Sequence, residues 1–149
     1  MIVLLDLNFT LAENSPVVWE RTGESFPERI KKETYRAWLI DLIRPHHVIL
    51  MTARMERYRV GTLANIAAKT GGWQPAEAYF NAGDLTPEKA KLGFLLDHVY
   101  PKHGQGGLFG AEQFIALESN KTTRAMYAKQ GILAMPIEDE RCRMMLATK

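Results

Sequence analysis

The sequence predicts an α/β protein with a doubly wound, mainly parallel five-stranded sheet. Apolar runs of strand length alternate along the chain with stretches of helical spacing. The runs are almost continuously hydrophobic, which is typical of parallel strands that helices cover on both faces. The five predicted strands are 2–7, 47–52, 77–80, 114–117 and 132–137.

Helical spacing fills the intervals between these runs. The first helix follows an i, i+3, i+4, i+7 stripe that Pro45 ends, and the second stops before Gly71. The third begins at "TPEK" (86–89), where a Thr cap precedes a Pro in the first helical position. The fourth closes on Gly131, and an amphipathic stretch forms a short terminal helix. The expected helices are 35–43, 56–69, 86–99, 121–130 and 138–149.

The composition indicates one domain over residues 1–149. The chain is 46% hydrophobic and 24% charged with a formal charge of +2, which is ordinary for a protein with its own core. Cys142 is the single cysteine, so we expect no disulfide framework, no thiolate metal site and a reducing, cytoplasmic compartment. No apolar run reaches the length of a membrane span and no secretory signal is recognisable, so no membrane partner is expected.

Polar residues gather at one rim of the predicted sheet. Ligands of doubly wound sheets bind beyond the carboxyl ends of the strands, and the loops there carry Asp6, Asn8, Thr10, Thr52, Arg54, Asp84, Glu118 and Ser119. The Gly-rich segment 102–110 leads into a strand and lies at the opposite end. A phosphate-binding loop follows a strand and opens a helix, so we interpret 102–110 as a flexible connector.

Four motifs stand in order along the chain. They are "DLNFT" (6–10) on the first strand, "ILMTAR" (49–54), "TPEKAK" (86–91) and the acidic turn "LESN" (117–120). Over nearly the whole chain this set resembles the haloacid dehalogenase (HAD) superfamily of phosphohydrolases, and most closely the 3′-phosphatase domain of bacteriophage polynucleotide kinases. The resemblance implies a HAD-like fold without a large cap domain, because 12–45 has room only for a loop and a helix as a minimal cap region.

The resemblance also implies roles for these residues. Asp6 would attack phosphorus and form an aspartyl-phosphate, and Mg²⁺ would be the cofactor. The ligands of Mg²⁺ would be the Asp6 side chain, the Asn8 carbonyl and an acid in the turn of Glu118 and Ser119, because this hard cation prefers oxygen.

Further roles concern the phosphoryl group. Thr52 would donate its hydroxyl to a phosphoryl oxygen, and Thr10 belongs to the same catalytic set. A lysine would neutralise the phosphoryl group and Asp6; the family's spacing favours Lys91, with Lys89 second. Arg54 is either a phosphate clamp or an ordinary solvated arginine.

Two positions depart from the family. Asn8 stands where these phosphatases usually carry an Asp as general acid and base, a contribution of about two to four orders of magnitude in rate. Glu13, His103 or a group on the substrate could replace it as proton carrier. Ser119 stands where an acid most often holds the metal, with Glu118 beside it.

Each candidate also has a purely structural interpretation. Asp6 and Asn8 could stabilise a turn, Thr52 could be a satisfied strand-end hydroxyl, and Glu118 gains from a helix dipole without any metal. The two lysines are also consistent with surface charge. The four histidines lack the spacing of a zinc site on a helix and are assigned no metal. "RIKKETYR" (29–36) is interpreted as the solvated face of the first helix.

The functional prediction is a Mg²⁺-dependent phosphatase of HAD type. Its expected substrate is a phosphorylated small molecule, nucleotide or nucleic-acid end, since an uncapped site suits large substrates, and a homo-oligomer could close the site. The alternative is a catalytically weakened or inactive HAD-fold protein that binds a phosphorylated ligand or a protein partner, which Asn8 and Ser119 favour. A phosphoryl-accepting regulatory domain is a third possibility, and it would not need Thr10.

Overall fold

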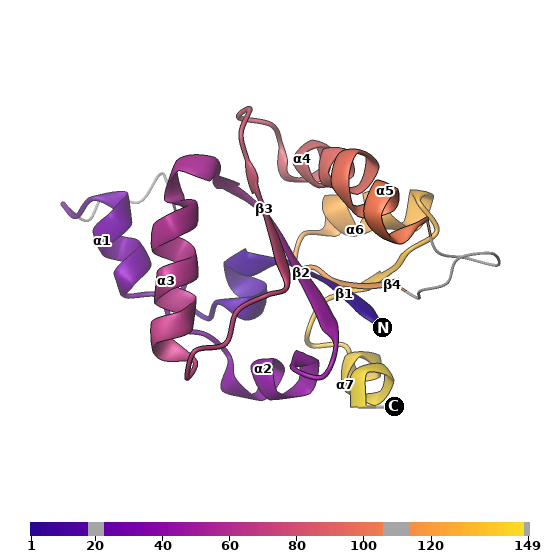
Figure 1. Ribbon diagram of the computed structural model, residues 1–149, viewed down its shortest axis with the longest axis horizontal. Helices are drawn as coiled ribbons and strands as arrows, with labels where there is room; N and C mark the ends of the chain where they lie inside the picture. Colours follow the sequence, from indigo (N-terminus) through magenta and orange to yellow (C-terminus); the bar gives the residue numbers. More distant parts are fainter. Residues whose placement is uncertain (18–22, 106–113, 148–149) are drawn as a thin grey trace.

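A five-stranded parallel sheet forms the centre of the protein (Figure 1). The computed structural model describes residues 1–17, 23–105 and 114–147. All adjacent strands pair in parallel, in the order β3-β2-β1-β4-β5. The strands are β1 (Ile2–Leu5), β2 (His47–Met55), β3 (Glu77–Asn81), β4 (Phe114–Leu117) and β5 (Leu133–Met135). The predicted α/β class and the doubly wound parallel sheet are confirmed.

Helices cover both faces of this sheet. The chain forms α1 (Phe26–Lys31), α2 (Ala37–Ile43), α3 (Arg59–Lys69), α4 (Pro87–Phe94), α5 (Tyr100–His103), α6 (Lys121–Lys129) and α7 (Glu140–Ala147). A 3₁₀ turn, Glu56–Tyr58, precedes α3, and a π-type turn, Leu95–Val99, joins α4 to α5. None of the helices in the described ranges is long and apolar enough to cross a membrane.

Each buried strand contributes to two cores. Val3 and Leu5 of β1 pack with α2, α3 and α7, whereas Ile2 and Leu4 pack with α6 and the helical segment that contains α5. Successive side chains of a strand point to opposite faces, so a strand that is buried on both faces needs apolar residues at every position. This is why the strand sequences are continuous apolar runs.

Several predicted boundaries were wrong. β1 ends at Leu5, and β2 continues to Met55 through an irregularity in its pairing with β3 between Met51 and Met55. Such a bulge changes the direction of the side chains within it, and Thr52 lies there. The predicted Gly-rich connector lies mostly outside the described residues, which stop at Gln105 before β4.

The first helical region also differs from the prediction. It contains two short helices, α1 and α2, and between them Tyr35 bridges to Ala12 in antiparallel fashion. The interpretation of 29–36 as a solvated face is wrong for three of its residues, because Ile30, Glu33 and Tyr35 are buried. Residues 29–36 return to the core because they connect α1 to the bridge between Tyr35 and Ala12.

Candidate active site

Asp6 lies at the carboxyl end of the central strand. The Asp6 backbone N–H donates to Leu117 O of β4 at 3.0 Å, and Asp6 is only 7% exposed to solvent. The chain then makes a π-type turn over Leu7–Leu11, in which Phe9 adopts the left-handed conformation with φ +59°. This turn brings Thr10 back over the Asp6 carboxylate.

Side chains from three other segments hold that carboxylate. Lys91 Nζ donates to Asp6 Oδ1 at 2.8 Å, while Thr10 Oγ1 and Ser119 Oγ donate to Asp6 Oδ2 at 2.8 and 2.9 Å. Burial by itself raises the pKa of Asp6, but the Lys91 ammonium outweighs it and holds the pKa below its usual value. Asp6 is therefore an oriented anion at neutral pH.

Lys91 joins two buried carboxylates. It is 1% exposed on α4, and its Nζ donates to Asp6 and to Glu118. Burial raises the pKa of Glu118 to about 7, because the attraction of Lys91 compensates only in part and the Asp6 charge adds to the increase. Of the two candidate lysines the structure brings Lys91 to Asp6, whereas Lys89 is exposed.

Oxygen atoms of Asp6, Asn8 and Ser119 lie close together. Ser119 Oγ donates to Asp6 Oδ2 and also to the Asn8 carbonyl oxygen at 3.2 Å. Carboxylate, carbonyl and hydroxyl oxygens are ligands that Mg²⁺ accepts, with water in the remaining positions. The three oxygens are thus of the kinds that Mg²⁺ binds, but only one of them belongs to a carboxylate. Both Glu118 carboxylate oxygens have other partners, Lys91 and the Asn120 N–H.

Thr52 and Arg54 lie in the irregular part of β2, and Arg54 contacts the site through Asn8. The Arg54 N–H donates to Thr52 Oγ1 at 3.0 Å. The Arg54 guanidinium forms a buried bidentate pair with Glu33, at 3.1 Å to Oε1 and 2.6 Å to Oε2, and also donates to Thr62 and to Asn8 Oδ1. These partners fix the Arg54 guanidinium beside the turn that follows Asp6.

Glu33 is the component that the sequence reasoning missed. It is fully buried and also accepts a hydrogen bond from the Tyr35 hydroxyl at 3.0 Å. It stands within a run of charged residues that looks like a solvated helix face. The sequence contains no clear signal of its burial, because Lys31 and Lys32 precede Glu33 and Tyr35 fits the start of the helical stripe over 35–43.

The other candidates make no hydrogen bond to Asp6 within the described residues. His103 ends α5 and contacts Glu77, which begins β3, so it lies at the amino edge of the sheet and cannot serve as proton carrier at Asp6. Glu13 is exposed, and its N–H donates to Thr34 O. Asp84 is an exposed turn residue with φ +54°.

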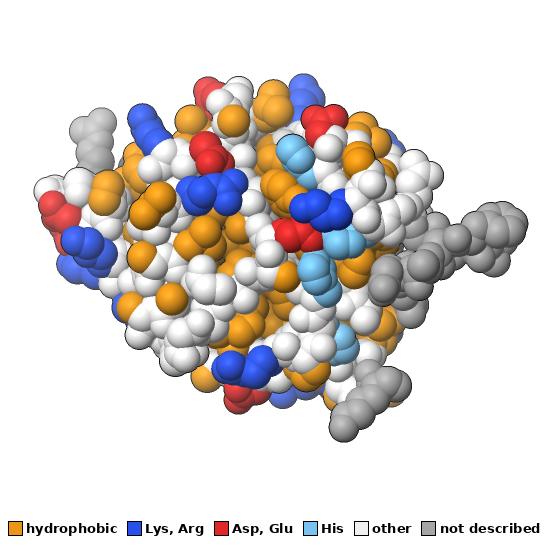
Figure 2. Space-filling model, in the orientation of Figure 1, with side chains coloured by type: hydrophobic (Ala, Val, Ile, Leu, Met, Phe, Trp, Pro, Cys, Tyr) orange, Lys and Arg blue, Asp and Glu red, His pale blue; other side chains and the backbone are white. Residues whose placement is uncertain are grey.

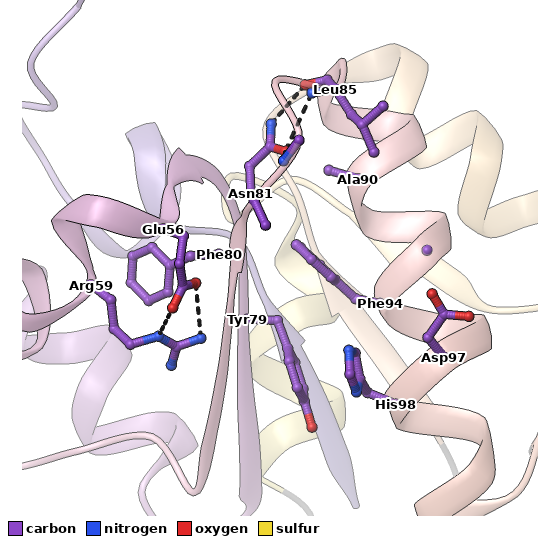
Figure 3. Close-up of a pocket in the computed structure, with 13 residues that line it drawn as sticks. Glu56, Arg59, Tyr79, Phe80, Asn81, Leu85, Ala90, Phe94, Asp97 and His98 are labelled. Carbon is purple, nitrogen blue, oxygen red and sulfur yellow. Dashed lines mark hydrogen bonds and ion pairs between the residues drawn. The ribbon is translucent and has the colours of Figure 1, made fainter.

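A pocket of about 410 Å³ lies beside the edge strand β3 and α4 (Figure 3). Tyr79, Phe94 and His98 line it, with Asn81 near its upper end in the view. The Asn81 side chain holds the following turn through Leu85 O, at 2.8 Å. Asp6 and Lys91 do not line this pocket, so it is separate from the carboxylate site.

Comparisons with known proteins leave the family open. No protein-family model matches the chain, and no curated protein matches it. The class defined so far is an α/β protein with a buried carboxylate–lysine–carboxylate cluster at the carboxyl edge of its sheet. A function has to follow from the chemistry of that cluster.

Proposed function

We propose that the protein is a Mg²⁺-dependent phosphohydrolase of HAD type that acts through an aspartyl-phosphate on Asp6. The observation that carries the proposal is the position of Asp6 at the end of the central strand, between Lys91 and the hydroxyls of Thr10 and Ser119. Burying a carboxylate is costly unless a cation and hydrogen-bond donors compensate its charge. Lys91 and the two hydroxyls do so here, and they keep Asp6 anionic and oriented, which a nucleophile requires.

The chemistry of the first step follows from these contacts. An Asp6 carboxylate oxygen forms a bond to phosphorus while the bond from phosphorus to the leaving oxygen breaks, which yields an acyl phosphate. Lys91, already 2.8 Å from Oδ1, offsets negative charge on the phosphoryl oxygens. Water then attacks the acyl phosphate, releasing inorganic phosphate and restoring the carboxylate.

Asp6 Oδ2, the Asn8 carbonyl and Ser119 Oγ would hold Mg²⁺. The bound ion supplies positive charge next to the phosphoryl oxygens. Since Ser119 is neutral, we expect weaker binding of Mg²⁺ than at a site with a second carboxylate. The Ser119 hydroxyl now donates to both of the other oxygens, and it would turn a lone pair to the cation instead.

The leaving group sets the expected substrate preference. The Asn8 amide cannot transfer a proton near neutral pH, and its oxygen accepts a hydrogen bond from Arg54 at 3.1 Å. Substrates whose leaving oxygen is stable without protonation, such as aryl or acyl phosphates, should therefore react faster than alkyl phosphates. For the cellular substrate we propose a nucleotide or polynucleotide terminal phosphate, on the basis of the sequence resemblance and the short α1–α2 region. Because this is an alkyl phosphate, a group on the substrate would have to protonate its leaving oxygen.

One observation favours the second candidate, a HAD-fold protein that binds a phosphorylated ligand or protein partner without turnover. Both Asp6 oxygens have hydrogen-bond partners, and Asn8 is held by Arg54. A site of this kind can accept a phosphate beside Lys91 without attacking it.

A hydrolysis assay separates the two candidates. With an aryl phosphate and Mg²⁺, we expect weak wild-type activity, none in Asp6→Asn, and about a tenfold or greater increase in Asn8→Asp, because general acid–base help returns. Lys91→Met should be inactive, while its exposed neighbour Lys89→Met, the matched control, should keep wild-type activity. Wild-type protein without activity, and no activity in Asn8→Asp combined with Ser119→Asp, would favour the binding protein.

A further inference from the structure

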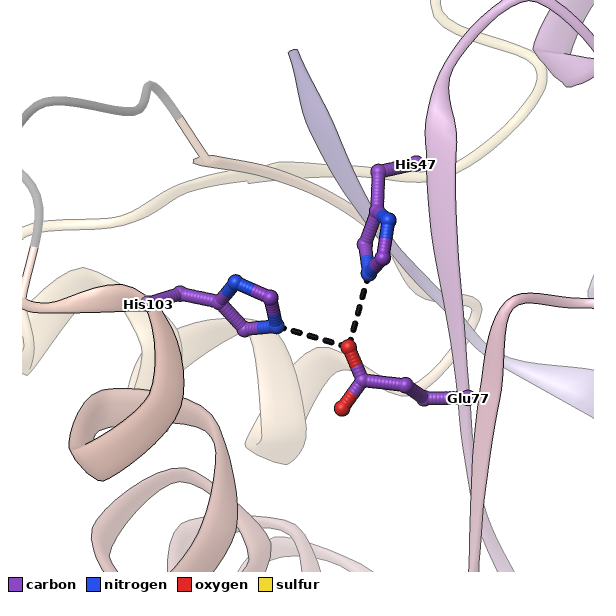
Figure 4. Close-up of side chains that lie close together, drawn as sticks. All are labelled: His47, Glu77 and His103. Atoms are coloured by element: carbon purple, nitrogen blue, oxygen red, sulfur yellow. Dashed lines mark hydrogen bonds and ion pairs between the residues drawn. The ribbon is translucent and has the colours of Figure 1, made fainter.

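Two histidines and a glutamate meet at the edge of the sheet opposite Asp6 (Figure 4). His47 begins β2, Glu77 begins β3, and His103 ends α5. Because Glu77 pairs with Ile49, two residues after His47, His47 and Glu77 project from the same face of neighbouring strands. Helix α5 covers that face and adds the third side chain.

The ring nitrogens converge on one oxygen atom. His47 Nε2 lies 2.7 Å and His103 Nε2 lies 2.6 Å from the same atom, Glu77 Oε2. One ligand atom from each residue lies within 4.8 Å of the others. Without a cation, N–H groups of the two rings donate to the carboxylate. A metal ion could replace those two protons.

We propose that His47, Glu77 and His103 form a binding site for a divalent transition metal ion of the Zn²⁺ class. Two imidazole nitrogens and a carboxylate oxygen suit Zn²⁺, Co²⁺ or Ni²⁺, whereas Mg²⁺ and Ca²⁺ prefer ligand sets made of oxygen. This site is distinct from the Asp6 site, because it lies at the amino ends of the strands and Asp6 follows the carboxyl end of β1.

Small movements would admit the ion. Ligands at about 2.0–2.2 Å in a tetrahedral site lie about 3.3–3.6 Å apart. His47 Nε2 and His103 Nε2, now 2.7 and 2.6 Å from Glu77 Oε2, would therefore each move about 0.6–1.0 Å away from it. The His47 side chain is 41% exposed, whereas the His103 and Glu77 side chains are 17% and 12% exposed. Figure 2 shows histidines gathered at the surface beside an acidic and a basic side chain, so a water ligand can complete the site.

The other Glu77 oxygen already has its partners. Tyr79 OH donates to Glu77 Oε1 at 2.7 Å and Lys102 Nζ lies 3.0 Å from it. Such support orients a ligating carboxylate. The Lys102 ammonium also repels an incoming cation, but its side chain is 56% exposed and can turn away. Removing this charge should therefore tighten metal binding, an effect that a merely structural cluster would not show.

Calorimetric titration of the whole, untagged chain with ZnCl₂ tests the proposal. We expect one ion per chain and, at about a hundredfold excess over Kd, a rise in Tm of about 5–10 °C. His47→Ala and His103→Ala should each weaken binding at least tenfold. The control His98→Ala should bind as wild type, since its ring stacks on Tyr79 outside the cluster.

Two variants keep the proposal falsifiable if a histidine variant folds poorly. Lys102→Met retains all three ligands and should bind Zn²⁺ more tightly by about three- to tenfold, because a like charge a few ångströms away is removed. Asp6→Asn should bind Zn²⁺ unchanged. Any of three results would overturn the assignment. One is loss of Zn²⁺ binding in Asp6→Asn, and another is wild-type affinity for Zn²⁺ in Lys102→Met. The third is wild-type affinity in both His47→Ala and His103→Ala.

Discussion

Arg54 and Glu33 form an ion pair that water does not reach. Their side chains are 1% and 0% exposed, and the guanidinium meets the carboxylate through two hydrogen bonds. Thr62 accepts a third hydrogen bond from Arg54. If the pair is structural, its disruption should destabilise the whole domain and not only the binding of phosphate.

Arg54→Met is the perturbation that tests this interpretation. The substitution leaves the Glu33 carboxylate buried with Tyr35 OH as its remaining partner. Removing one member of a buried pair costs about 3–5 kcal/mol, because the other charge is left uncompensated. That is a large fraction of the roughly 5–15 kcal/mol that stabilises a typical domain. Urea unfolding followed by circular dichroism should show the loss as a lower midpoint with an unchanged slope.

A double-mutant cycle isolates the interaction. Glu33→Gln combined with Arg54→Met removes both charges, so the double variant should be more stable than the sum of the single losses predicts, by about 1–3 kcal/mol. Arg141→Met is the matched control, since Arg141 pairs with Asp139 at 2.8 Å but is 61% exposed. Its substitution should leave the urea midpoint nearly unchanged, because water screens an exposed pair.

Two results would refute the reasoning. One is an Arg54→Met variant as stable as wild type that has lost affinity for phosphate, because Arg54 would then be a ligand of the substrate. The other is full additivity in the cycle, which would mean that Arg54 and Glu33 do not stabilise each other.

Three further outcomes are expected. Lys91→Met should lose about 3–5 kcal/mol in urea unfolding, because Asp6 and Glu118 stay buried without their shared ammonium; a loss below 1 kcal/mol would contradict the buried cluster. Phe9→Gly should be more stable than Phe9→Ala by about 1 kcal/mol, since only glycine adopts φ +59° without strain, and the reverse order would show an unstrained turn. In metal-free buffer, the stability lost in Glu77→Gln should be greatest above about pH 4.5 and should shrink as the pH falls toward 2. Burial raises the pKa of Glu77, but hydrogen bonds, led by the one from His47, outweigh this effect and lower the pKa to about 2. The charged carboxylate therefore stabilises the fold at pH values above the pKa of the unfolded chain. A stability difference between wild type and Glu77→Gln that does not change with pH would contradict this prediction.

Local patterns were enough to predict the architecture. A parallel strand that is covered on both faces must be apolar throughout, so "IVLLDL" and "FIAL" predicted β1 and β4. Helix signals were equally local, since Thr86 and Pro87 mark the start of α4. The ends of β1 and β2 were missed, because the turn after Leu5 and the bulge before Met55 depend on contacts with distant residues.

The sequence by itself determined the α/β class and the place of Asp6 at the tip of the first strand, while the motif spacing of the resemblance favoured Lys91 and kept Lys89 second. Only the tertiary structure decided what surrounds those groups. It buried Glu33 against Arg54, placed Ser119 Oγ between Asp6 and the Asn8 carbonyl, and brought His47, Glu77 and His103 together from three elements. Periodicity reports which face of an element is buried, whereas the partner of a polar side chain depends on how separate elements pack.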